Sequence, residues 1–313
     1  MTDVDTGSRD RLALAVLAQY RMATTEQMHL ILSPDVRIEQ TRRRLMKLRG
    51  EGLIDRITLP QAGRTRVWHP TQYGALIAGE WSELRGRRPP RGAVDRTAVR
   101  LKVGHGLTVT ETALAFLQDA RRRGDVCRPL DWIPEVHHPL GGGEAVIPDA
   151  LLYYQCRSAD GTTSTDGGGD GDDVRGGVML RAFVEVDRAT MGSERLAAKL
   201  GSYARLHSYA PVPAVRQRQQ PFSEPIQEGW RQRYPLFPRL LFVLDGTGPA
   251  GVETRISALR AATRGHELAA FLREIPVLAT PMTDLLQHGP AAPVWRPVQE
   301  PDHRVDWMHT PHP

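Results

Sequence analysis

The N-terminal part of the chain changes its hydrophobic period once. Apolar residues first recur at helical spacing in three successive segments, and two short β-rich runs then flank a turn that contains Gly63. Thr24 or Thr25 is a suitable N-cap for the second helix, and Ser33-Pro34 ends it. The predicted helices are 9–20, 22–32, 37–50 and 71–83, and the predicted hairpin strands are 53–59 and 65–68.

The third of these helices is strongly basic. Three helices followed by a two-stranded hairpin is the element order of a winged helix-turn-helix, whose third helix enters the DNA major groove. We therefore predict a winged helix DNA-binding domain over residues 1–84, and a solvated basic helix without a nucleic acid partner is the alternative. The predicted DNA-binding residues are Arg37, Arg42, Arg43, Arg44, Lys47 and Arg49 on the helix, and Arg64 and Arg66 on the wing.

A second module follows residues 85–104, which carry arginine, proline and glycine and are expected to form a basic linker. The predicted fold class is α/β (α+β overall), with an αβββαβ second domain over residues 105–288. Residues 157–177 are rich in Asp and Gly and predict a disordered loop, and residues 289–313 predict a peripheral Pro-rich tail. The predicted helices are 106–123, 193–209 and 252–264, and the predicted strands are 131–138, 145–155, 179–186, 239–244 and 276–280.

Charge is divided unevenly between the two modules. The 313 residues include 41 Lys and Arg and 36 Asp and Glu, for a formal net charge of +5. Residues 1–104 hold 19 basic and 11 acidic residues, a net of +8, and the remainder has a net of −3. A basic first module suits contact with phosphate. The polar N-terminus, the lack of a long apolar run and the presence of only two cysteines predict a cytoplasmic protein outside the membrane.

Three carboxylates gather in the predicted strands of the second module. Glu185 and Asp187 are two residues apart in one strand and therefore point to the same face, and Asp149 lies in the preceding strand. Mg²⁺ or Mn²⁺ would offset their mutual repulsion and would polarise a phosphodiester, so these three are the hypothetical metal ligands. Lys199 and Tyr203 share the inward stripe of the next helix and complete the predicted catalytic set.

These residues carry a resemblance to known families. Pro148-Asp149, then Glu185-Val186-Asp187, then Lys199 and Tyr203 resemble the motifs of the PD-(D/E)XK nuclease superfamily. Over about residues 10–296 the chain is similar to the actinobacterial replication-relaxation family, which combines a winged helix with E-x-D-R and K-L-x-x-Y motifs. The resemblance implies a restriction-endonuclease-like second domain and a role in the replication or relaxation of plasmid or mobile-element DNA.

One departure from the superfamily pattern leaves the activity open. Asp187 stands where the third strand normally carries a lysine, so either Lys199 substitutes from the helix or the nuclease-like site is inactive. A structural salt-bridge cluster with Arg188, Arg195 and Lys199 is the alternative to a metal site. Glu111 is either a fourth carboxylate or a solvated helix residue.

Three functions follow from these alternatives. The first is a protein that binds double-stranded DNA in the replication, transfer or regulation of a plasmid or mobile element, with a nuclease-like domain that is inactive or conditional. The second is a Mg²⁺-dependent DNA nuclease or nickase that uses the residues named above. The third is a dimeric winged-helix transcriptional regulator, because a homodimer would match a palindromic site.

Overall fold

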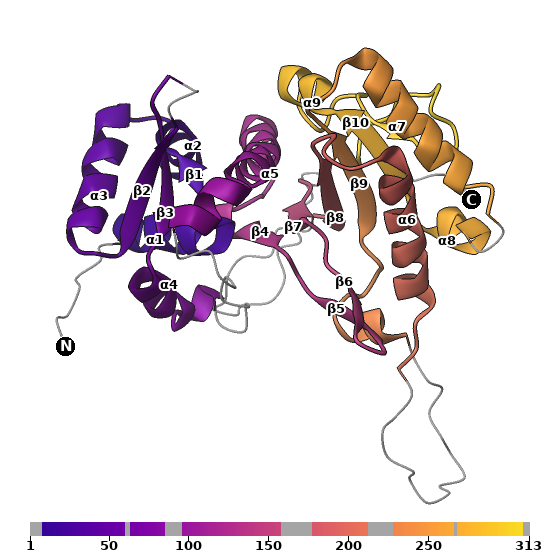
Figure 1. Cartoon of the computed structure of the whole chain (residues 1–313), viewed down its shortest axis with the longest axis horizontal. Coiled ribbons are helices and arrows are strands. Elements are labelled where there is room, and N and C mark those ends of the chain that lie inside the picture. The colour runs from indigo at the N-terminus through magenta and orange to yellow at the C-terminus, as the bar shows by residue number, and fades with distance from the viewer. Residues whose placement is uncertain are drawn as a thin grey trace, which may run out of the picture. The chain divides into compact units, whose positions relative to one another are not determined.

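The chain folds as two compact units. A computed structural model describes residues 8–59, 63–84, 96–157, 177–211, 228–265 and 268–308. The first unit comprises Met1–Pro134 and Leu152–Leu180, and the second comprises Glu135–Leu151 and Arg181–Pro313. The boundary passes through two strands, β7 (Ala150–Gln155) and β8 (Met179–Asp187), so each contributes residues to both units (Figure 1).

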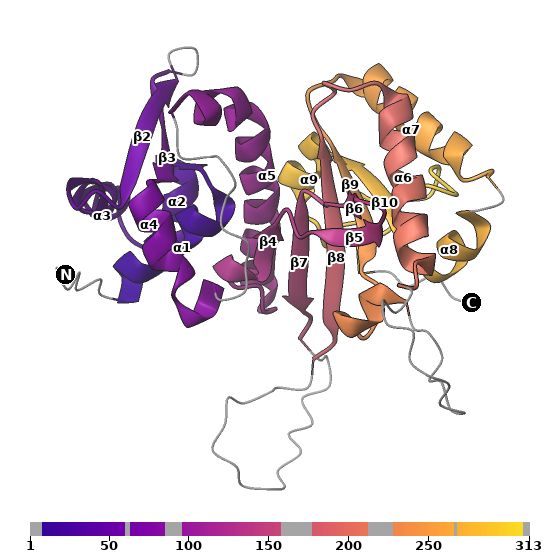
Figure 2. The same cartoon turned by 60° about the horizontal axis from the view of Figure 1, so that its bottom comes forward.

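The first unit begins with a winged helix-turn-helix, as predicted. Its three-stranded sheet has the order β1-β3-β2, and β2 and β3 form an antiparallel hairpin beyond the third helix (Figure 2). The elements are α1 (Ser8–Tyr20), β1 (Ala23–Thr24), α2 (Thr25–Leu32), α3 (Ile38–Gly50), β2 (Ile54–Leu59), β3 (Thr65–Pro70), α4 (Gln72–Gly79) and the 3-10 turn η1 (Ser82–Leu84).

Local sequence explains where these elements begin and end. Thr24 caps α2 in a capping box, because its side chain accepts the amide of Gln27 while the Gln27 side chain accepts the amide of Thr24. Gly52 follows α3 with φ +74, a left-handed conformation that costs glycine little. Thr71 caps α4 by accepting the amide of Gly74. The second of the two predicted N-caps, Thr25, instead accepts the indole N–H of the buried Trp68.

The helix after the winged helix is longer than the sequence pattern predicts. Helix α5 (Arg96–Arg123) begins inside the segment 85–104 that is predicted as a linker. Its Thr110 hydroxyl donates to the carbonyl of Met22 at 3.0 Å, and the Gln27 amide donates to Glu111 at 2.7 Å. These contacts attach α5 to the winged helix, so the first unit extends past the predicted boundary at residue 84. It also contains η2 (Pro129–Asp131) and β4 (Trp132–Pro134), and β4 lies next to β7.

The second unit is built on parallel strands. Its strands lie in the order β11-β10-β9-β8-β7, in which β8, β9 and β10 are parallel and β11 is antiparallel to β10. Every residue of β9 is buried, as expected for a strand covered on both faces. The further elements are β5 (His138–Gly141), β6 (Glu144–Val146), α6 (Ser193–Ser208), η3 (Gly229–Gln232), β9 (Arg239–Leu244), α7 (Pro249–Ala262), α8 (Ala269–Glu274), β10 (Val277–Pro281), α9 (Met282–His288) and β11 (Arg296–Pro297).

The αβββαβ order is present, but two of the predicted strands are interrupted. The run 131–138 breaks at Glu135, whose φ is +51, into β4 and β5. The run 145–155 breaks at Pro148, between β6 and β7. Three consecutive glycines, 141–143, take positive φ and turn β5 into β6, which forms a separate hairpin packed against α6 (Figure 1). Helices α8 and α9 were not predicted, because six and seven residues are too few to show a helical period.

The prediction of a peripheral C-terminal tail is wrong for its described part. Trp295 and Trp307 are fully buried, and β11 adds an edge strand to the sheet. The Trp295 indole donates to the Pro290 carbonyl at 2.8 Å, and the buried Arg239 donates to the Trp307 carbonyl at 3.0 Å. Frequent prolines prevent regular structure but not burial, because they leave the tryptophans free to pack.

Two of the sequence-based expectations cannot be compared with the structure. Most of the predicted loop 157–177, and residues 85–95 of the predicted linker, lie outside the described residues. Across the part of the chain that the structure describes, no helix combines the length and the apolar character that crossing a membrane requires.

The burial of Trp295 generates a stability prediction. Trp295→Ala should lower the free energy of unfolding of the second unit by about 3–5 kcal/mol, because it removes a fully buried ring. Leu286→Ala, at a side chain in α9 that is 50% exposed, is the matched control and should change it by less than about 0.5 kcal/mol. Urea unfolding measures both. Equal effects of the two substitutions would mean that the C-terminal segment is peripheral after all.

Candidate functional site

The end of β8 presents two buried carboxylates. Glu185 and Asp187 are 2% and 7% exposed. Glu185 contacts α6 and Asp187 contacts α7, and these two helices cover one face of the sheet (Figure 2). Strand alternation explains this arrangement, because residues two apart in a strand point to the same side. Burial of a carboxylate is costly unless hydrogen bonds and opposite charge compensate it. The partners of these two side chains therefore define what the site can do.

Glu185 is held by both predicted residues of α6. The Tyr203 hydroxyl donates to Oε1 at 2.6 Å, and the Lys199 ammonium forms an ion pair with Oε2. Burial, followed by the negative charge of Asp149, raises the pKa of Glu185 to about 7. Lys199 and Tyr203 act in the opposite direction but do not cancel the effect of burial. Glu185 is therefore a carboxyl group that changes charge near neutral pH.

Asp149 joins the same cluster from the segment before β7. This half-buried residue follows Pro148, and its Oδ2 accepts the backbone amide of Val186 at 2.7 Å. Burial lowers the pKa of Lys199, but the charges of Glu185, Asp149 and Asp187 outweigh it and leave that pKa raised. Lys199 thus lies within the electrostatic reach of all three carboxylates. We call Asp149, Glu185 and Asp187 the carboxylate cluster.

Asp187 has a different cationic partner, which the sequence analysis missed. The Arg255 guanidinium on α7 donates from Nε to Oδ2 at 2.5 Å, and the Ala189 amide donates to Oδ1 at 3.1 Å. Arg255 is itself 9% exposed. A signal was present in the sequence, because Arg255 lies beside Val252 and Ile256 on the apolar stripe of its helix. The same argument singled out Lys199.

The cluster does not match the predicted three-carboxylate metal site. In the described part of the chain, no three His, Cys, Asp or Glu side chains are grouped closely enough to hold a metal ion. Both oxygens of Glu185 and both of Asp187 are already hydrogen-bonded to protein groups. As arranged, these residues do not fit a Mg²⁺ ion held by all three. The catalytic and metal-binding roles of Asp149, Glu185, Asp187, Lys199 and Tyr203 stay predictions.

The alternative salt-bridge cluster is present with different members. Lys199 contributes as expected, but Arg188 approaches Asp245 at 4.0 Å instead of the cluster. Arg195 forms no ion pair with any described residue. Arg255 supplies the second cation. Glu111, the suggested fourth carboxylate, lies on α5 in the first unit, where it accepts a hydrogen bond from Gln27.

The predicted DNA-binding residues of α3 and the wing fall into two groups. The first group is engaged by acidic residues of the same unit: Arg44 and Lys47 both contact Asp10 on α1, at 2.7 and 2.9 Å, and Arg49 contacts Asp55 on β2 at 3.2 Å. The ion pairs with Lys47 and Arg44 outweigh partial burial and lower the pKa of Asp10. These residues orient α3 against its neighbours.

The second group faces solvent. Arg37, Arg43, Arg64 and Arg66 are exposed, and none forms an ion pair with another described residue. Among the described residues, Arg42 has one ion-pair contact, an exposed one of 3.5 Å to Glu39 on its own helix. Arg56 on β2 was not predicted; it lies 5.5 Å from the ring centre of Trp68. Its pKa is lowered, first by partial burial and then by the positive charges of Arg66 and Arg49.

A groove connects α3 to the wing. It has a volume of about 410 Å³ and lies between the start of α2, Arg42 of α3 and the β2–β3 turn. Gly63 and Arg64 take left-handed conformations in that turn, with φ of +60 and +61. The groove is lined by Thr25, Glu26, Arg42, Gly63, Arg64, Thr65 and Arg66. Three arginines against one glutamate make it a basic groove, which suits an anionic group.

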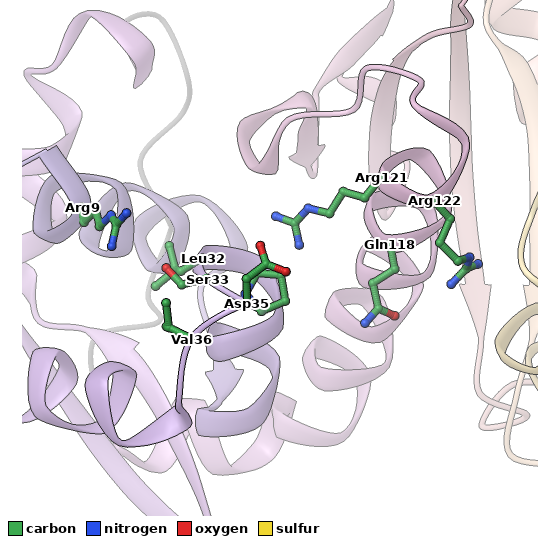
Figure 3. Close-up of a pocket in the computed structure, with 9 residues that line it drawn as sticks. Arg9, Leu32, Ser33, Asp35, Val36, Gln118, Arg121 and Arg122 are labelled. Atoms are coloured by element: carbon green, nitrogen blue, oxygen red, sulfur yellow. The ribbon is translucent and has the colours of Figure 1, made fainter.

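A larger cavity of about 760 Å³ lies elsewhere in the first unit. Figure 3 shows Gln118, Arg121 and Arg122 of α5 beside the α2–α3 turn. Arg121 is not free to bind a ligand there, because its guanidinium donates to the carbonyls of Leu30 and Ile31 at the end of α2. None of the carboxylate cluster lines this cavity.

Comparison with known families agrees with the motifs. The replication-relaxation family matches residues 14–215, about two thirds of the chain, including α3, the wing and the carboxylate cluster. The chain belongs to the replication-relaxation family. Arg255 lies outside the matched residues. No curated protein matches this replication-relaxation protein.

Solved structures resemble only part of this replication-relaxation protein. A mutant of Lactococcus lactis ZitR has 20% sequence identity, with a TM-score of 0.22, over 25% of this chain and 51% of the ZitR chain. A mutant of E. coli MarR has 17% identity, also with a TM-score of 0.22, over 38% of this chain and 74% of the MarR chain. The chain spans about half the length of the ZitR structures that it matches. The winged helix assignment therefore rests on element order and strand pairing.

The buried Glu185 generates a pH prediction for this replication-relaxation protein. Its pKa rises from 4.5 to about 7 on folding, so between these values the folded state holds a proton that the unfolded state has released. The free energy of unfolding should therefore fall as pH rises from 4.5 to 7. Glu185→Gln removes the titrating group, and urea unfolding across this range should show a flatter profile for the variant. Parallel profiles for the two proteins would contradict a raised pKa.

Proposed function

We propose that this replication-relaxation protein binds double-stranded DNA through α3 and the β2–β3 wing, in the replication, transfer or regulation of a plasmid or mobile element. The observation that carries the proposal is the group of exposed arginines without acidic partners in the described residues: Arg37, Arg43, Arg64 and Arg66. Arg42, Arg64 and Arg66 line one groove and repel one another, and a polyanion relieves that repulsion.

The geometry of α3 supports two different roles for its basic residues, one in contacting DNA and one in positioning the helix. Thr41, Leu45 and Leu48 form its buried face, and Arg43 projects from the opposite side of the helix. Arg42 projects toward the wing, where it lines the basic groove with Arg64 and Arg66. Arg44, Lys47 and Arg49 were predicted as DNA-binding residues, but their ion pairs with Asp10 and Asp55 favour a positioning role.

The basic groove suits the DNA backbone. Arginine pairs with phosphate through two parallel hydrogen bonds, and three arginines, Arg42, Arg64 and Arg66, line the groove. The exposed face of α3 would then lie in the major groove with Arg43 toward the bases. A homodimer, predicted from the symmetry of many DNA sites, stays a prediction.

The DNA-binding proposal predicts a loss of phosphate contacts on substitution. Arg43→Ala, Arg64→Ala and Arg66→Ala should each weaken binding to duplex DNA. Arg64→Ala and Arg66→Ala, which remove phosphate contacts, should each also reduce the slope of log affinity against log salt by about one. Fluorescence anisotropy over a salt series measures both quantities.

A matched control separates this effect from a general loss of charge. Arg122→Ala removes an exposed arginine of the same unit that is paired with Asp119 at 2.8 Å, and it should leave the salt slope unchanged. If all three test variants retain the wild-type slope, α3 and the wing are not the DNA surface.

A metal-dependent nuclease is the second candidate. One observation favours it: Asp149, Glu185 and Lys199 lie together, in the chain order expected from the resemblance to PD-(D/E)XK nucleases. Arg255 on Asp187 and the absence of a three-ligand group among the described residues oppose it.

This candidate makes its own prediction. The full chain should nick supercoiled plasmid in Mg²⁺ or Mn²⁺ but not in EDTA, and Glu185→Gln should abolish nicking while the gel shift in the same lanes is retained. A gel shift without nicking in either metal would eliminate the nuclease and leave the DNA-binding proposal standing.

A further inference from the structure

Two side-chain cations reach into the carboxylate cluster from two different helices. Lys199 on α6 pairs with Glu185, and Arg255 on α7 pairs with Asp187. The Lys199 side chain is 34% exposed, whereas that of Arg255 is 11% exposed. Helices α6 and α7 also pack against each other. The two cations therefore enter the cluster from adjacent positions above the same strand.

The hydrogen bonds of Arg255 hold it rigidly in place. Its Nε donates to Asp187, one Nη donates to the carbonyl of Met191 at 3.3 Å, and the other donates to the carbonyl of Gly251 at 3.4 Å. An arginine committed in three directions is not a mobile surface charge that a diffusing ion would easily displace. The Tyr203 hydroxyl donates to the other oxygen of Glu185 and so orients that carboxylate for its ion pair with Lys199.

The positive charges of Lys199 and Arg255 balance negative charge in the cluster. When Glu185 is ionised, the three carboxylates near this strand end carry three negative charges, and burial makes their repulsion larger than in water. A divalent cation would offset two of those charges. Lys199 and Arg255 together offset the same two charges, and they do so with groups that belong to the fold.

We propose that Lys199 and Arg255 act as the resident counter-cations of the carboxylate cluster and take the place of a divalent metal ion. The cluster is then a metal-free junction that ties α6 and α7 to the end of β8. This inference concerns only the second unit and stands independently of DNA binding by the first.

Thermal unfolding of the full chain tests the proposal with Mn²⁺ as the probe. The wild-type melting temperature should be the same in millimolar Mn²⁺ and in EDTA. Lys199→Met should melt about 5–10 °C lower in EDTA, because a buried carboxylate loses its partner, and Mn²⁺ should restore part of that loss. Lys199→Met combined with Glu185→Gln should melt above the single variant, since both charges are gone, and should not respond to Mn²⁺.

The ion pair between Arg255 on α7 and Asp187 allows a second, independent test. Arg255→Met should lower the melting temperature and gain a Mn²⁺ response, and adding Asp187→Asn should reverse both effects. Arg205→Met is the matched control. Arg205 lies on α6, the same helix as Lys199, and its substitution breaks an exposed ion pair with Glu144. It should neither destabilise the protein markedly nor create a response to Mn²⁺.

Two results would overturn the proposal. A rise in the wild-type melting temperature with Mn²⁺ would mean that the cluster binds metal despite its resident cations. The lack of a Mn²⁺ response in both single variants would mean that the cations do not stand in for a metal. If the single variants fail to fold, the wild-type protein can be titrated with Mn²⁺ while paramagnetic resonance measures the free ion. Binding of one Mn²⁺ per chain, seen as loss of the free-ion signal, would contradict the proposal.

Discussion

The second unit depends on the hydrogen bonds and ion pairs that stabilise the buried carboxylate of Glu185 at the end of β8. Glu185 is almost completely removed from water, so it needs hydrogen bonds and positive charge from nearby elements. From α6, Tyr203 donates a hydrogen bond to Glu185 and Lys199 forms an ion pair with it. From α7, Arg255 forms an ion pair with Asp187. The helices above the sheet are thus tied to the strand below by charge as well as by apolar packing. Removal of one partner would leave a buried charge unpaired, which costs more than the pair itself contributes.

Arginine serves two distinct purposes in this arginine-rich chain. At Arg37, Arg43, Arg64 and Arg66 it is exposed, and these guanidinium groups have no acidic partner among the described residues. In the second unit Arg255 is buried, and each of its three guanidinium nitrogens donates a hydrogen bond. Arginine suits both situations because its planar group stays charged and offers donors in several directions. Exposure and partners, rather than residue type, separate the arginines that suit a nucleic acid from those that hold the fold.

Much of the first unit could be predicted from its sequence, because its signals are local. The caps at Thr24 and Thr71, the glycine after α3 and the β-rich runs around Gly63 each act over a few residues. The winged helix order follows directly from them. The basic residues of α3 could be predicted as a group but not divided, because Asp10 lies more than thirty residues away from Arg44 and Lys47. The first residues of α5 resemble a linker in the sequence, and the packing of Val103 against Met22, Ile57 and Val67 is visible only in the folded unit.

The sequence by itself determined the element order of the winged helix and the αβββαβ order of the second domain, and it brought Asp149, Glu185, Lys199 and Tyr203 to attention. Strand alternation and helical spacing were sufficient for that, since both are short-range rules. Only the tertiary structure decided the partner of each carboxylate. Arg255 reaches Asp187 across 68 residues of chain, and Arg239 reaches the Trp307 carbonyl across the same separation. The physical reason is that burial and charge pairing depend on which elements pack together, and packing is a property of the whole chain.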